Sequence, residues 1–139
     1  MSVKEGRIFI GRFPYKADLL NALNDFCGKN NIRLGVFSVI GAVVCAKMGY
    51  YKQQEQQYVE CVSLEKKLEI VSCLGNISLK ENKPFVHAHI TLADLKGQCY
   101  GGHLMPGTII FAAEYYIKEL TGLELQRGLD QETGLSLWI

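Results

Sequence analysis

The sequence predicts an α+β fold in which one largely antiparallel sheet of about six to seven strands carries one main helix. Two patterns indicate it: a single segment with helical spacing near the N-terminus, and a series of Val- and Ile-rich segments separated by short polar turns. The 139 residues suit one domain, which we expect to span residues 1–139 with its core in residues 7–139. The apolar fraction of 48% excludes an intrinsically disordered chain.

The N-terminal part predicts a strand followed by the helix. Residues 7–13 alternate between apolar and polar types, and Pro14 ends that strand. Apolar side chains in residues 19–27 recur on one helical face. Asp18 is expected to place a negative charge in the first turn, where the helix dipole favours it. The Gly-Lys-Asn-Asn cluster at residues 28–31 ends the helix.

The rest of the chain predicts strands joined by turns. The turns carry Gly, Pro, Asn, Asp or clustered charges, which are typical of chain reversals. Gly41 and Gly49 are candidate bends in the longest strand. Residues 108–120 fit a strand or a helix, and their β-branched and aromatic content favours a strand. The strands are expected at residues 35–51, 58–64, 68–79, 85–92, 98–104 and 108–120, and residues 135–139 could add an edge strand.

Charge and cysteine usage limit the partners and the compartment. The net charge of +1 predicts no strong overall attraction to nucleic acid or to an anionic membrane. Basic side chains at turns, such as Lys66, Lys67 and Lys96, are expected to be solvated. No apolar run is long enough to span a bilayer and no signal peptide is evident, so we expect a soluble, cytoplasmic protein. The five cysteines have no Cys-x-x-Cys spacing and predict free, buried thiols.

Three histidines form the main candidate site. Side chains alternate along a strand, so His87 and His89 share one face. If residues 95–97 form a three-residue hairpin loop, His103 lies opposite His89 on that face, whereas a two-residue loop would put it on the other. Three imidazole nitrogens can hold zinc or another divalent transition metal and leave one coordination position open. The alternative is a solvated or hydrogen-bonded histidine face without metal.

Two other residues are weaker candidates. Glu114 is a lone acid in an apolar run and could orient a histidine or act as a general base. Alternatively, its carboxylate faces solvent or is paired across a subunit contact. Cys99 has the strand parity of His103 and could be a ligand, but a packed thiol is the simpler interpretation. The residues alone leave open whether the protein is an enzyme.

Several segments together resemble the plants and prokaryotes conserved domain family, called PPC or PCC. The run at residues 68–78 is similar to the family's FEILSLSGSF segment. It is followed by His87-Ala88-His89 and by the Gly-Gly-His-Leu-Met-Pro-Gly run at residues 101–107, as in the family. Residues 38–42 and 113–114 are also typical, so the resemblance covers about residues 7–139.

The resemblance implies a largely antiparallel sheet flanked by helix, assembled as a homotrimer. It also implies that His87, His89 and His103 hold a metal, with zinc as the expected ion. Plant relatives join the domain to AT-hooks that bind A·T-rich DNA, and stand-alone prokaryotic members are commonly labelled DNA-binding by analogy. This chain has no Arg-Gly-Arg-Pro hook and no basic arm, so neither a hook nor its charge supports DNA as a partner.

Two functions from different classes follow from the residues and the resemblance. The first is a homotrimeric metal-binding protein with a regulatory or assembly role, for which DNA is a candidate partner. The second is a small metalloenzyme that uses the three-histidine site on an unknown small substrate, with Glu114 as acid or base.

Overall fold

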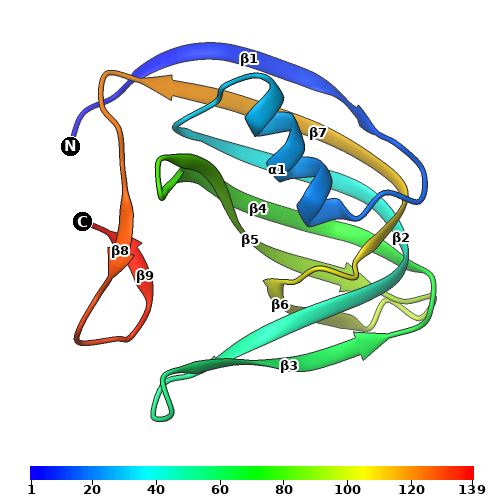
Figure 1. The fold of residues 1–139 in the computed structure, drawn as a ribbon. Coiled ribbons are helices and arrows are strands. Elements are labelled where there is room, and N and C mark those ends of the chain that lie inside the picture. Colours follow the sequence, from blue (N-terminus) through cyan, green and yellow to red (C-terminus); the bar gives the residue numbers. More distant parts are fainter.

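The computed structural model describes residues 1–139 as a strongly curved, mostly antiparallel sheet with one helix on one face (Figure 1). Seven strands form the main sheet in the order β1-β7-β2-β4-β5-β6, with β3 paired to β2. This confirms the predicted α+β class. The elements are β1 (Lys4–Phe13), α1 (Leu19–Lys29), β2 (Gly35–Lys52), β3 (Gln57–Leu64), β4 (Leu68–Lys80), β5 (Lys83–Ala93), β6 (Cys99–Leu104), β7 (Ile109–Thr121), β8 (Arg127–Leu129) and β9 (Ser136–Trp138).

The helix α1 packs through the predicted face, on which Leu19, Leu23 and Cys27 are buried. Asp18 is the N-cap residue rather than part of the first turn, because one carboxylate oxygen accepts a hydrogen bond from the backbone N–H of Asn21 at 3.0 Å. Its other oxygen accepts from the backbone N–H of Gly107 at 2.6 Å, which ties the helix to the β6–β7 connection. The structure contains no helix long and apolar enough to cross a membrane.

The long strand β2 changes partners along its length, and this change closes the sheet. Its first part lies between β4 and β7, and its second part pairs with β3 and with the end of β6. The register shifts next to Gly41 and next to Gly49, which confirms both predicted bends. Gly41 has a φ of +142°, and a β-carbon there would lie 2.1 Å from the carbonyl oxygen of Ala112.

The main sheet has two different faces. The inner face packs with α1 around a core that includes Val39, Cys73 and Ile90. We call the opposite side the outer face, and one of its rows crosses six strands: Ile10, Tyr116, Ser38, Leu74, His89 and His103 are successive partners. The histidines therefore lie on the same surface as several exposed apolar side chains.

The C-terminal residues form a small second sheet. The predicted edge strand at residues 135–139 is found as β9, but it pairs with β8 and not with the main sheet. The sequence analysis missed β8 because three residues carry no readable periodicity. The hairpin is attached to β4, where the backbone N–H of Leu79 donates to the carbonyl of Leu125 at 2.8 Å.

All five cysteines are free, as predicted, but their expected burial is only partly correct. Cys27 and Cys73 are buried and Cys45 is half-buried, whereas Cys61 and Cys99 are exposed. The reason is that a strand buries alternate residues, so an apolar segment still turns half of its side chains outward.

Candidate metal centre

The β5–β6 hairpin sets the register of the histidines. The backbone N–H of Asp94 donates to the carbonyl of Gln98 at 3.0 Å, and that of Gly97 donates to the carbonyl of Asp94 at 2.8 Å. Gly97 has a φ of +75°, the left-handed conformation expected in a three-residue loop. The loop therefore has the predicted length, and His89 pairs directly with His103.

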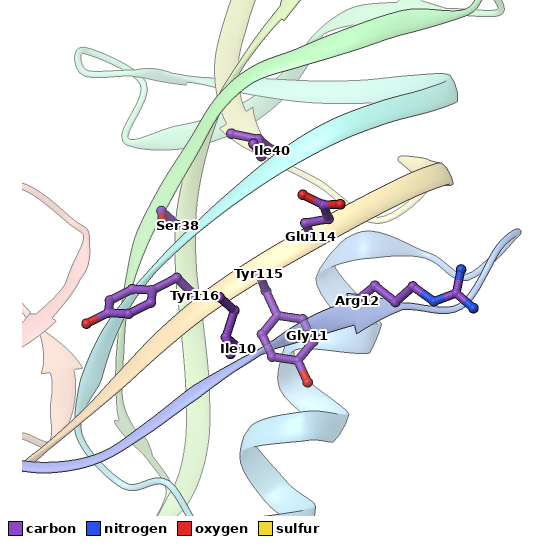
Figure 2. A pocket seen from close by; sticks show the side chains of 8 residues that line it. All are labelled: Ile10, Gly11, Arg12, Ser38, Ile40, Glu114, Tyr115 and Tyr116. Carbon is purple, nitrogen blue, oxygen red and sulfur yellow. The ribbon is translucent and has the colours of Figure 1, made fainter.

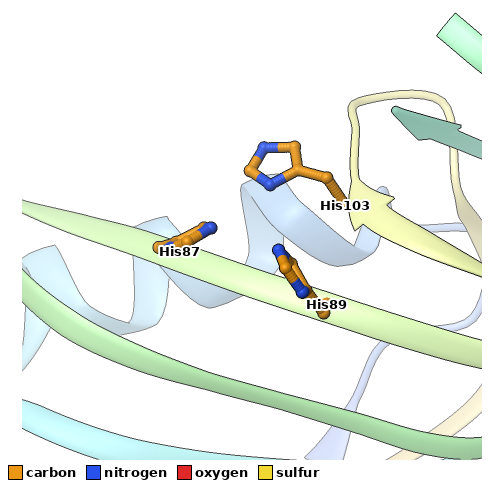
Figure 3. Close-up of side chains that lie close together, drawn as sticks. All are labelled: His87, His89 and His103. Carbon is orange, nitrogen blue, oxygen red and sulfur yellow. The ribbon is translucent and has the colours of Figure 1, made fainter. Parts of the chain in front are cut away.

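The structure brings His87, His89 and His103 together, and we call these residues the histidine triad (Figure 3). Their candidate ligand nitrogens all lie within 4.8 Å of one another. The ring centroids are 5.1 Å apart for His87 and His89, 5.1 Å for His87 and His103, and 5.6 Å for His89 and His103. Three imidazoles at this spacing can share one metal ion.

Two nitrogens of the triad lack hydrogen-bond partners. The Nε2 atom of His87 and the Nδ1 atom of His103 are buried, and neither has a partner in the protein. Leaving a buried polar atom unpaired costs about 1–3 kcal/mol, so such atoms are rare and call for a partner such as an ion. A metal ion would satisfy both nitrogens at once, and the triad therefore fits one.

The surroundings keep His87 and His103 uncharged at neutral pH. Burial, followed by the charges of His103, Arg127 and His89, lowers the pKa of His87 to about 4. Burial and the charge of His89 also lower the pKa of His103. Neutral imidazole is the form that binds a metal, so neither side chain has to lose a proton at neutral pH to bind one.

Two further residues border the triad, and the sequence analysis missed both. The Tyr58 ring of β3 lies against His103, with centroids 4.6 Å apart. The Arg127 guanidinium of β8 donates to the side-chain oxygen of Asn76, which pairs with His87 across β4 and β5. The sequence carries no signal for either contact, because both residues lie far from the histidines along the chain.

The structure does not bring Glu114 or Cys99 to the triad. Glu114 is on β7, which β2 and β4 separate from β5 in the sheet. It lines a hollow of about 610 Å³ on the outer face (Figure 2), next to Arg12 and Ile40. Cys99 pairs with Ala93 near the hairpin loop, and its thiol contacts the carbonyl of Gly97.

The family model for the Plants and Prokaryotes Conserved (PCC) domain matches residues 1–121. The chain belongs to this family. Two similar structures of PCC relatives cover 99% of the chain, each with a TM-score of 0.93. One is a metal-containing protein from Archaeoglobus fulgidus, 38% identical over 96% of that chain, and the other is a PPC protein from Pyrococcus horikoshii, 35% identical over 94% of that chain.

Other similar proteins carry different descriptions. A protein from Ralstonia eutropha, provisionally described as DNA-binding, is 25% identical, with a TM-score of 0.80 over 93% of this chain and 88% of that one. The bifunctional protein GlmU of Synechococcus is 29% identical over 130 residues, which are 92% of this chain. The chain spans about a fifth of the length of the curated relatives it matches.

Proposed function

We propose that this PCC-domain protein is a homotrimeric zinc-binding protein with an assembly or regulatory role, in which His87, His89 and His103 hold the ion. The observation that carries the proposal is the pair of buried, unpartnered nitrogens on His87 and His103. Three neutral nitrogen donors suit zinc and similar divalent ions better than calcium or magnesium, which prefer oxygen. The relative from Archaeoglobus fulgidus is described as metal-containing, which supports metal binding.

The side chains around the triad support a functional site. Three protein ligands leave one coordination position, and zinc held in this way supplies Lewis acidity when bound. His87 and His103 are held by strand pairing, and the Tyr58 ring covers one side of His103. His89 is exposed, so a small molecule can approach the triad from that side. A metalloenzyme is therefore the alternative function of the same site.

Exposed apolar side chains on the outer face support the proposed homotrimer. Ile10, Ile40 and Leu74 are exposed by 83%, 56% and 59%. A contiguous exposed apolar patch usually marks an interaction surface, and a second and third copy of this chain are the occupants we propose. Leu74 pairs with His89, so the triad borders this surface. Glu114 lies on the same face beside Ile10 and Ile40, so we assign it to the subunit contact and not to metal binding.

The test combines elemental analysis with light scattering on protein purified without a histidine tag. We expect about one zinc per chain in the wild type and none in His89→Ala, which removes an exposed side chain and should leave the fold intact. Thr91→Ala, the next position on the same face of β5, is the matched control and should keep its zinc. A metal-free wild type after incubation with zinc, or a monomeric wild type, would contradict the proposal.

DNA binding is a second candidate, favoured by the relative from Ralstonia eutropha. The net charge of +1 argues for at most a local contact surface. Binding through phosphate contacts weakens steeply as salt rises, because counterions are released on binding. We therefore expect the affinity of any complex to fall steeply between low and physiological salt, measured by fluorescence anisotropy with duplex DNA. No binding at low salt would exclude this role.

A further inference from the structure

Arg127 is held beside the triad by neutral partners only. Its Nε donates to Ser78 Oγ at 2.9 Å, one terminal nitrogen donates to Asn76 Oδ1 at 2.8 Å, and the other donates to the carbonyl of Ser136 at 2.8 Å. The guanidinium carbon also lies 5.5 Å from the ring centroid of Phe85 and 5.6 Å from that of Trp138. It takes part in no ion pair, unlike Arg7 and Arg33, which each contact a glutamate.

Its position relative to the triad follows from the strand register. Asn76 and Ser78 pair with His87 and Phe85, so the guanidinium lies over two neighbouring rows of the β4–β5 pair. The charge of Arg127 acts on His87, and it also acts on Tyr58, whose ring lies against His103. Arg127 therefore forms one side of the same site and is more than an anchor for the C-terminal hairpin.

With a divalent metal ion bound, the site would carry an excess of positive charge. A divalent ion held by three neutral imidazoles keeps its charge of +2, and Arg127 adds +1, since arginine stays protonated in proteins. No aspartate or glutamate belongs to the triad or is bonded to Arg127. Half-buried positive charges of this kind attract an anion to the site.

We propose that Arg127 and the metal-loaded triad together form a binding site for a small oxyanion of the carboxylate or phosphate class. The inference rests on the proposed zinc site. Guanidinium has five N–H groups, and three are used by Asn76, Ser78 and Ser136, which leaves two on the terminal nitrogens for an oxyanion. A shallow depression of about 280 Å³ is lined by His87, His89 and Asn76, and Arg127 reaches its edge through the hydrogen bond to Asn76, so a group of this size has room beside the guanidinium. The family model matches residues 1–121, so Arg127 on β8 lies outside the matched residues.

The test uses protein loaded with cobalt(II), whose visible absorption reports both metal binding and changes in its coordination. Wild type is titrated with sodium acetate, sodium sulfate and, as an uncharged analogue, acetamide. We expect acetate or sulfate to shift the spectrum with saturation, and acetamide to have no effect. In Arg127→Gln we expect the same cobalt stoichiometry and an anion affinity weaker by about tenfold or more, because a charge-assisted hydrogen bond is lost.

Matched variants separate a binding role from a structural one. Arg33→Gln removes a charge that also anchors the C-terminal segment, through Glu124, and should bind anions as the wild type does. Arg127→Lys keeps the charge and should bind anions more tightly than Arg127→Gln. If wild type takes up no cobalt, the zinc site itself fails. If cobalt binds but anions act no more strongly than acetamide, or Arg127→Gln matches wild type, the oxyanion site is refuted and the zinc site stands.

Discussion

His89 of β5 and His103 of β6 lie directly opposite each other, with ring centroids 5.6 Å apart. The relationship depends on the three-residue loop between the strands, since a one-residue change in register moves a side chain to the other face. Asp94 stabilises that loop through one carboxylate oxygen, which accepts from the backbone N–H groups of Lys96 and Gln98. The metal centre therefore depends on turn chemistry several residues away from it.

Shortening this loop should abolish metal binding. Deletion of Lys96 leaves a two-residue connection, which places His103 on the face opposite His89. We expect zinc per chain to fall to background in elemental analysis, while far-ultraviolet circular dichroism still shows a β-rich fold. Lys96→Ala keeps the loop length and the backbone hydrogen bond to Asp94, and it should retain zinc. A deletion variant with full zinc content would show that the hairpin register does not control the site.

Metal-free protein should lose stability as the pH falls from about 6.5 to about 4. The pKa of His87 is about 4 in the folded chain, mainly because of burial, and an unfolded histidine titrates near 6.5. The unfolded state therefore binds more protons in this interval, and the free energy of unfolding falls by at most about 1.4 kcal/mol per pH unit for this group. Urea unfolding with a chelator present measures the slope. His87→Gln should reduce it, with the remainder due in part to His103, whose pKa is also lowered, and an unchanged slope would assign the pH dependence to other groups.

Loss of the Asp18 side chain should destabilise the fold by about 1–2 kcal/mol, the usual cost of removing an N-cap. The effect should reach the upper part of this range because Asp18 also accepts a hydrogen bond from Gly107. Asp18→Ala and Asp25→Ala can be compared by urea unfolding. Asp25 is an exposed acid on the same helix, and its substitution should change stability by less than about 0.5 kcal/mol. Equal effects of the two substitutions would rule out the capping role.

A charged side chain introduced on the outer face should dissociate the proposed trimer into single chains. Ile40 lies on the central strand β2 next to Glu114 of β7, and its side chain is 56% exposed. Ile40→Asp would place a second carboxylate beside Glu114 and bury an unpaired charge in the subunit contact, which costs several kcal/mol. Light scattering should therefore report single chains for Ile40→Asp and three-chain particles for Leu95→Asp, a substitution at the exposed tip of the β5–β6 hairpin. Three-chain particles for both variants would locate the contact elsewhere.

Local patterns in the sequence determined the elements and part of the site. The apolar spacing of residues 19–27 specifies the helix because a helix repeats every 3.6 residues. The alternation in residues 85–92 places His87 and His89 on one face, and a single choice of loop length then brings His103 to them. Each of these inferences involves residues close together in the chain, where backbone geometry alone fixes the relationship.

Contacts between segments far apart in the chain became known only from the tertiary structure. The second part of β2 leaves β4 and β7 and pairs with β3 and β6, which brings Tyr58 against His103. The short strand β8 carries Arg127 onto Asn76, 51 positions earlier in the chain. Such contacts depend on how the sheet curves and closes around its core, which no local periodicity encodes. For this reason the sequence alone indicated the three histidines and not the arginine beside them.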